Sequence, residues 1–121
     1  MCSVDVTSLF TNVPVDEVIQ LCLDKLFSGR EKVHGLTRKQ LQKLLVISVK
    51  ENHFLFDNEY YDQIDGVGMG SPLGPALASV FMCNLEQEAF AKCPKEFAPE
   101  FYRRYVDDTF LVFNCENHAK R

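Results

Sequence analysis

Two adjacent aspartates, Asp107 and Asp108, interrupt an apolar and aromatic segment near the end of the chain, FYRRYVDDTFLVF. Two strand-like runs with a polar break between them predict a β-hairpin, with this pair at its tip. A two-residue turn normally contains glycine, because its central residues adopt positive φ, and neighbouring carboxylates repel one another. The pair therefore indicates either a solvated turn or a binding site for a positively charged ligand.

A third aspartate, Asp5, lies at the end of another predicted strand. The segment CSVDV predicts a short strand over residues 2–6, in which Asp5 stands between Val4 and Val6. Taken alone, Asp5 fits a carboxylate on the solvent face of an edge strand.

A glycine-rich segment, DGVGMGSPLGP, precedes a long apolar helix that we expect over residues 76–93. Four glycines within nine residues expose backbone N–H groups and let a ligand approach closely. The alternative is a flexible loop capped by Ser71, with Pro72 at the first helical position.

Two more helices are expected between these segments. Helical spacing predicts the first over residues 15–27, with Pro14 at its first turn. Thr37 and Gln40 form a capping box for the second, over residues 37–52. The expected inner faces are Val15, Val18, Ile19, Cys22 and Leu26 in the first helix and Leu41, Leu44, Leu45 and Ser48 in the second.

The remaining segments complete an α+β fold in which a small antiparallel sheet packs on helices. Residues 53–63 predict an aromatic hairpin whose turn is Asp57-Asn58. Residues 7–14 and 28–35 are expected to be loops. We expect one domain over residues 1–121.

The composition argues against a chain that grips nucleic acid by itself. There are 13 Lys and Arg against 17 Asp and Glu, a formal charge of −4. The scattered cysteines lack any CxxC pair, which favours free thiols in a reducing compartment. With no signal peptide or membrane-length apolar run, we expect an intracellular protein, cytoplasmic or nuclear, with no membrane partner. The cysteines are Cys2, Cys22, Cys83, Cys93 and Cys115.

The three segments together are more specific than any one of them. A strand-end aspartate, a glycine-rich turn onto a helix and a hairpin-borne aspartate pair, in this order, are the parts of two-metal nucleotidyl transfer. In that chemistry, two ions about 4 Å apart activate a primer 3′-hydroxyl and stabilise the leaving pyrophosphate. Mg²⁺ suits such a site because it prefers carboxylate oxygens and keeps several of its waters.

The segments SVDVTSLFTNVP, DGVGMGSPLGPALASVF and FYRRYVDDTFLVF resemble motifs A, B and C of reverse transcriptases. The amino-acid sequence of these motifs is most similar to that of the enzymes of Penelope-like retroelements. The resemblance extends from the first residues to about Phe113. The resemblance implies a polymerase palm, RNA-directed DNA polymerase activity and two Mg²⁺ ions, with Mn²⁺ as an alternative. It also implies three partners, namely an RNA template, a DNA primer and deoxynucleoside triphosphates.

The resemblance also assigns roles to single residues. Asp5, Asp107 and Asp108 match the catalytic, metal-binding aspartates, and the carbonyl of Val6 matches a backbone metal ligand. Phe10 matches the steric gate, where an aromatic ring crowds a 2′-hydroxyl and so favours deoxynucleotides. The turn against the incoming nucleotide and template is matched by Gly70, Ser71 and Pro72, whereas Met69 replaces the Gln that many reverse transcriptases carry.

The chain also departs from the family's pattern. The basic fingers motifs would precede Met1, and motif D would begin only at residues 118–121. We therefore expect a partial reverse transcriptase domain from a longer retroelement protein, inactive and marginally stable when isolated. The alternative is a relic or co-opted chain that no longer polymerises and acts by binding a partner.

Overall fold

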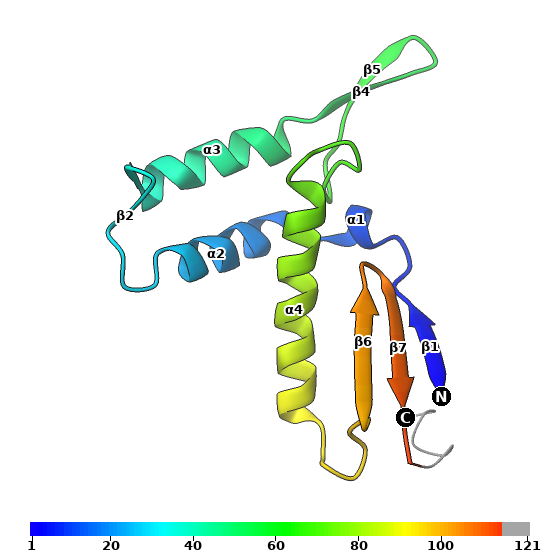
Figure 1. The fold of residues 1–121 in the computed structure, drawn as a ribbon. Coiled ribbons are helices and arrows are strands. Elements are labelled where there is room, and N and C mark those ends of the chain that lie inside the picture. The colour runs from blue at the N-terminus through cyan, green and yellow to red at the C-terminus, as the bar shows by residue number, and fades with distance from the viewer. Residues whose placement is uncertain (115–121) are drawn as a thin grey trace. The chain divides into compact units, whose positions relative to one another are not determined.

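The computed structural model describes residues 1–114 and shows a mixed α+β fold with small antiparallel sheets (Figure 1). Two expectations, the free thiol of Cys115 and motif D at residues 118–121, lie outside the described residues. The helices are α1 (Leu9–Asn12), α2 (Val15–Leu26), α3 (Arg38–Lys50) and α4 (Gly74–Lys92). The strands are β1 (Cys2–Asp5), β2 (Lys32–Val33), β3 (Leu36–Thr37), β4 (His53–Phe56), β5 (Glu59–Asp62), β6 (Phe101–Tyr105) and β7 (Asp108–Val112).

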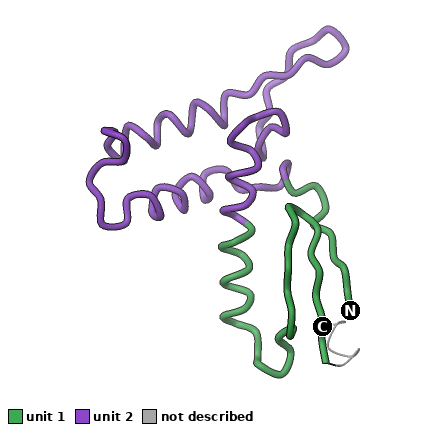
Figure 2. Tube along the Cα trace, in the orientation of Figure 1, with its two compact units in different colours: residues 1–9, 82–121 green, residues 10–81 purple. Residues whose placement is uncertain are grey.

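The chain divides into two compact units (Figure 2). Unit 1 comprises Met1–Leu9 and Met82–Arg121, and unit 2 comprises Phe10–Phe81. Helix α4 begins in unit 2 and ends in unit 1, so each unit has its own part of this helix. No helix within residues 1–114 is both long and apolar enough to cross a membrane.

Unit 1 contains a three-stranded antiparallel sheet in the order β1-β7-β6. Exposure alternates along β6, because successive side chains of a strand point to opposite faces. The side chains of Tyr102 and Arg104 belong to the face that contacts the unit 1 part of α4, where both bond to Glu86. The opposite face is open, and it carries Asp5 and Asp108 beside the exposed aromatic residues Phe101, Tyr105 and Phe110.

Unit 2 is built around α2 and α3, and both helices form where the sequence predicts them. The Thr37 hydroxyl accepts a hydrogen bond from the Gln40 N–H, and the Gln40 side chain accepts one from the Thr37 N–H, which confirms the capping box. Two acidic residues lie in the first turn of α2, where the helix dipole favours them. The buried residues of α2 are Val18, Ile19 and Leu23, and that of α3 is Val49.

The predicted inner faces of these helices are partly wrong. Leu26 is 42% exposed and Leu44 is 50% exposed, and Ser48 is exposed as well. The Ser48 hydroxyl donates to the Leu44 carbonyl one turn earlier, so its hydrogen bond is satisfied at the helix surface. Apolar residues occupy more than one face of each helix. Val18 and Ile19 are buried as predicted, whereas Leu23 and Val49 are buried although the spacing did not select them.

Two expected loops contain short regular elements. Residues 7–14 include the single turn α1, and residues 28–35 include β2, which pairs with β3 in a two-residue ladder. The loop of this small hairpin, His34-Gly35, has φ of 50° and 78°, the left-handed region that such turns require. Pro14 is the N-cap residue of α2, one position before the first helical residue.

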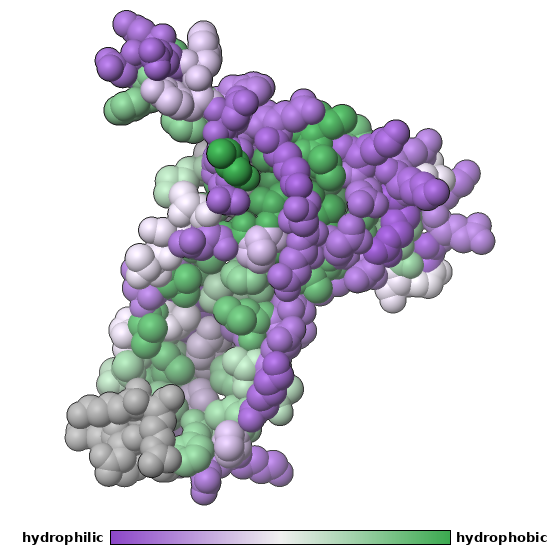
Figure 3. All heavy atoms as spheres, turned by 180° about the vertical axis from the view of Figure 1, so that it is seen from behind, coloured by the Kyte–Doolittle hydropathy of each residue, from purple (hydrophilic) through white to green (hydrophobic). Residues whose placement is uncertain are grey.

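Strands β4 and β5 form the predicted aromatic hairpin, with Asp57-Asn58 as its turn. Both turn residues have positive φ, 49° and 61°, which aspartate and asparagine tolerate well. Every residue of the two strands is exposed, and Figure 3 shows hydrophilic residues at the hairpin tip. Phe54 and Tyr61 stack across the strands with ring centroids 5.6 Å apart.

Candidate metal centre

Three carboxylates from distant parts of the sequence meet at one end of the unit 1 sheet. Each of Asp5, Asp107 and Asp108 offers one carboxylate oxygen, and these oxygens lie within 4.8 Å of one another. Asp5 and Asp108 are exposed, whereas Asp107 is half-buried. We call these residues the carboxylate trio. The structure therefore brings together the three predicted catalytic residues.

Strand pairing explains how the trio is assembled. Asp5 lies directly opposite Asp108 in the antiparallel ladder between β1 and β7. The Val6 N–H donates to the Asp107 carbonyl at 3.0 Å, so Val6 and Asp107 occupy a hydrogen-bonded position of this ladder. The next pair, Asp5 and Asp108, consequently occupies a non-hydrogen-bonded position, where opposing side chains come closer.

A buried side chain fixes the register one step further along the ladder. Thr109 is 8% exposed, and its hydroxyl donates to the Val4 carbonyl at 2.7 Å. This bond ties β7 to β1 next to the trio. Because a slip of one residue would turn every side chain to the other face, it also holds Asp5 and Asp108 on the same face.

The turn of this hairpin is Val106-Asp107, which corrects the expectation that Asp107 and Asp108 form the tip. Asp108 is already the first residue of β7 and pairs with Tyr105 of β6. Val106 has a φ of 55°, a conformation that is a true outlier for a β-branched residue. Backbone strain of this kind persists only where the surrounding structure enforces it, and it is frequent at functional sites.

The trio offers the oxygen donors that a hard divalent cation prefers, at a spacing slightly wider than one shared ion requires. Two oxygens bound to the same Mg²⁺ lie at most about 4.2 Å apart, because each Mg–O distance is about 2.1 Å. The trio oxygens lie within 4.8 Å of one another, so small side-chain rotations would bring them into a shared ligand set. Like charges directly opposite in a sheet are destabilising, and a cation would offset that repulsion.

Behind the trio, on the covered face of the sheet, lies a charged network. The Arg104 Nε donates to Glu86 of α4, and the Tyr102 hydroxyl donates to the same carboxylate oxygen at 2.6 Å. Burial, followed by the hydrogen bond and charge of Glu86, raises the pKa of Tyr102 to about 12. Burial acts to lower the pKa of Arg104, but the hydrogen bond and charge of Glu86, together with Cys83 and Tyr102, outweigh it and raise that pKa.

The other predicted site residues belong to unit 2 and are described within it. Phe10 is half-buried, and its ring packs near Gly74, the first residue of α4. Gly70 and Pro72 are exposed, and Met69 is 76% exposed. The Ser71 hydroxyl accepts from the Leu73 N–H at 3.3 Å, so Ser71 caps a turn that precedes α4, and Pro72 lies before the helix rather than at its first position.

Two glycines of the same segment have a structural role that sequence reasoning missed. A Cβ at Gly66 would lie 2.5 Å from the Phe10 carbonyl oxygen, and this glycine has a φ of 75°. That carbonyl accepts the Val67 N–H at 2.8 Å. A Cβ at Gly74 would lie 2.8 Å from the Gly68 carbonyl oxygen, whereas the predicted Gly70 has open space around it. Gly66 and Gly74 therefore allow the close backbone packing that fixes Phe10.

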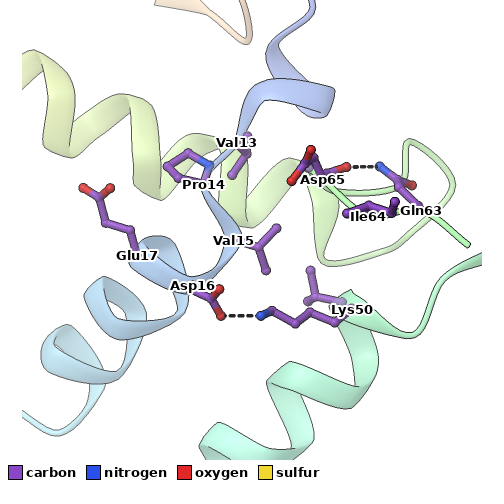
Figure 4. Close-up of a pocket in the computed structure, with 11 residues that line it drawn as sticks. Val13, Pro14, Val15, Asp16, Glu17, Lys50, Gln63, Ile64 and Asp65 are labelled. Atoms are coloured by element: carbon purple, nitrogen blue, oxygen red, sulfur yellow. Dashed lines mark hydrogen bonds and ion pairs between the residues drawn. The ribbon is translucent and has the colours of Figure 1, made fainter.

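A cleft of about 330 Å³ lies within unit 2 between the start of α2, the end of α3 and residues 63–66 (Figure 4). In its wall Lys50 pairs with Asp16 at 2.6 Å, and the Gln63 side chain donates to the Asp65 carbonyl at 2.9 Å. No residue of the trio lines this cleft. Its polar groups are therefore partly satisfied by one another.

Neither the family models nor the curated proteins with which the chain was compared give a match.

Proposed function

We propose that the chain is the palm core of an RNA-directed DNA polymerase and performs two-metal nucleotidyl transfer. One observation carries the proposal, namely the meeting of Asp5, Asp107 and Asp108 within 4.8 Å on adjacent strands of a small antiparallel sheet. About a hundred residues separate Asp5 from the other two in the sequence. A purely solvated turn gives no reason for a third carboxylate to be held directly opposite Asp108.

In this proposal the trio binds and orients two Mg²⁺ ions, with Mn²⁺ as the alternative, and the Val6 carbonyl is an additional ligand. The bound ions supply Lewis-acid stabilisation of the attacking 3′-hydroxyl and of the leaving pyrophosphate. The chain contributes fixed carboxylates on neighbouring strands, which hold the ligand oxygens close together before any ion binds. Such preorganisation lowers the cost of assembling the site.

The proposed substrates are deoxynucleoside triphosphates, with a DNA primer paired to an RNA template. Phe10 is proposed as the gate that rejects a 2′-hydroxyl, and its fixed position between Gly66 and Gly74 supports that role. Gly70, Ser71 and Pro72 are proposed to lie against the incoming nucleotide and template. A formal charge of −4 gives no net electrostatic attraction to the phosphates of nucleic acid. We therefore propose that the chain works within a longer retroelement protein.

The test is primer extension on an RNA template by the longest protein product that carries these residues. We expect Mg²⁺-dependent addition of deoxynucleotides, and we expect Asp107→Asn to abolish it. Undiminished synthesis by that variant would overturn the catalytic assignment. Absence of synthesis by the unaltered protein would instead favour the alternative, a relic that acts by binding a partner.

A further inference from the structure

Arg104 contacts the backbone of the turn that carries the carboxylate trio. It follows Arg103 in β6, and its side chain is 13% exposed. Its Nη1 donates to the Val106 carbonyl at 3.0 Å, and its Nη2 donates to the Cys83 sulfur at 3.5 Å. Its Nε donates to Glu86, so the three nitrogens of one guanidinium engage three separate groups.

Glu86 holds this guanidinium in place. Its side chain is 19% exposed and accepts hydrogen bonds from both Arg104 and Tyr102. The planar guanidinium presents its donors in a rigid fork. Once Nε is fixed by Glu86, the direction of the other two nitrogens is largely determined.

The Val106 carbonyl belongs to the peptide unit that joins Val106 to Asp107. The next peptide unit joins Asp107 to Asp108, and its carbonyl, that of Asp107, accepts a hydrogen bond from the Val6 N–H at 3.0 Å. Both peptide units that flank Asp107 are therefore held, one by Arg104 and one by β1. Val106 has a φ of 55°, a conformation that a valine leaves readily when nothing holds it.

We propose that Arg104, oriented by Glu86, is a positioning residue that holds the strained Val106-Asp107 turn. The Asp107 carboxylate is thereby kept close to those of Asp5 and Asp108. This inference rests on the proposed function, because it concerns the same cation site. The guanidinium of Arg104 contacts Glu86, the Val106 carbonyl and the Cys83 sulfur, so the proposed role is indirect. It acts through the backbone of Asp107, from the face of the sheet opposite the trio.

The test is titration of the 121-residue chain with Tb³⁺, a hard ion that prefers oxygen ligands. Energy transfer from a nearby tyrosine sensitises the emission of bound Tb³⁺. Tyr105, which pairs with Asp108, provides the sensitiser. Arg104→Lys keeps the charge but cannot donate in the same fork to Glu86 and Val106. We expect this variant to bind Tb³⁺ roughly tenfold more weakly, the lower end of the loss found when outer-shell partners of a metal site are removed.

Arg103→Lys is the matched control. Arg103 is the preceding residue and lies on the open face, where its guanidinium stands 4.8 Å from the Phe101 ring centroid. Its Nη1 donates to the Tyr102 carbonyl rather than to the turn. The same change of arginine to lysine should therefore leave Tb³⁺ affinity unchanged at this position.

A second pair of variants keeps the inference testable if Arg104→Lys fails to fold. Glu86→Gln removes the charge that orients Arg104, and Glu88→Gln is its control, since Glu88 pairs instead with Lys92 in the same helix. We expect Glu86→Gln to weaken Tb³⁺ binding. Combined with Arg104→Lys it should cause little further loss, because the two residues act as one device.

The outcomes separate this inference from the proposed function. If the unaltered chain binds Tb³⁺, Asp107→Asn abolishes that binding and folded Arg104→Lys binds as tightly as the unaltered chain, the positioning role is wrong and the metal site stands. A variant that melts earlier but keeps its Tb³⁺ affinity when folded also refutes the positioning role, since the contribution of Arg104 is then only structural. If the unaltered chain is folded but does not bind Tb³⁺, the proposed metal site itself fails.

Discussion

The two aromatic hairpins of this chain, β4–β5 and β6–β7, each have a two-residue turn. They differ in the contacts that support that turn. In β4–β5 the left-handed positions are taken by Asp57 and Asn58, and every residue of both strands is exposed. In β6–β7 a left-handed position is taken by Val106. That strain, together with the repulsion within the trio, is opposed by a third strand, a helix and the half-buried Arg104.

The difference separates two ways of making a hairpin. Turn residues that tolerate positive φ let β4–β5 form with support from side-chain pairs of the hairpin itself, such as the stacked Phe54 and Tyr61 rings and the His53–Asp62 pair. In the β6–β7 turn the position with positive φ is occupied by Val106, which does not favour it. The conformation of this turn therefore depends on contacts from elsewhere in unit 1. The first hairpin is therefore specified locally, whereas the second is specified by tertiary structure. We therefore expect the functional site to lie at the β6–β7 hairpin, where tertiary contacts hold a strained turn.

The largest expected contrast concerns the aspartate in each turn. Asp107→Asn removes one trio carboxylate with little change in size, and we expect nucleotide addition to fall by at least roughly 10³-fold, the order seen when a member of a catalytic unit is removed. Asp57→Asn makes the same change in the other hairpin and should leave addition unchanged. Single-nucleotide primer extension measures both rates. Equal rates in the two variants would erase the functional distinction between the hairpins.

The next contrast concerns one side-chain pair in each region. Glu86 and Arg104 have side chains that are 19% and 13% exposed, whereas the His53 and Asp62 side chains are 65% and 77% exposed. Glu86→Gln leaves a half-buried guanidinium without its anion, and we expect the free energy of unfolding to fall by about 2 kcal/mol. Asp62→Asn should cost under about 0.5 kcal/mol, as exposed pairs do. Urea denaturation measures both, and equal losses would contradict the contrast in support.

Exchanging turn residues should have smaller effects of opposite sign. Val106→Asn relieves a left-handed valine that is 43% exposed, and we expect the free energy of unfolding to rise by about 1 kcal/mol. Asn58→Val introduces the same strain into the β4–β5 turn and should lower local stability by about 1 kcal/mol. Hydrogen exchange of the strand amides reports each hairpin separately. Destabilisation by Val106→Asn would show that the Val106 side chain matters more than its backbone conformation.

Much of the fold was predictable because its signals are local. The apolar spacing of α2 and α3, the Thr37–Gln40 capping box and the Asp57-Asn58 turn each involve residues close in sequence. The single turn α1 and the β2–β3 ladder were not predicted, since elements of four and two residues are too short to show a period. The His34-Gly35 turn was the one signal that could have indicated the ladder.

The site was predictable only in part, for a related physical reason. The identity of the trio follows from three short motifs, but its geometry depends on the pairing of β1 with β7. The role of Arg104 depends on Glu86, which lies 18 residues earlier and in a helix. Spacing cannot predict which side chains meet across such a separation. Nor does it show that Val106, rather than Asp108, shares the turn with Asp107.

The effect confined to strongly alkaline pH belongs to the supported β6–β7 hairpin. The pKa of Tyr102 is raised to about 12 by burial and then by Glu86. Its ordinary value in an unfolded chain is about 10. A group whose folded pKa is the higher one adds stability below the unfolded value and loses it as the pH rises through the folded value. Stability should therefore decline between about pH 10 and about pH 12.

Ultraviolet titration of the phenolates, with denaturation followed over the same range, measures this effect. Tyr102 should account for a late ionisation, near pH 12. Tyr102→Phe should remove that step and flatten the accompanying loss of stability, whereas Tyr60→Phe in the exposed hairpin should leave both in place. A late step that survives Tyr102→Phe would mean that Glu86 does not hold this hydroxyl, and the support assigned to the β6–β7 hairpin would be correspondingly weaker.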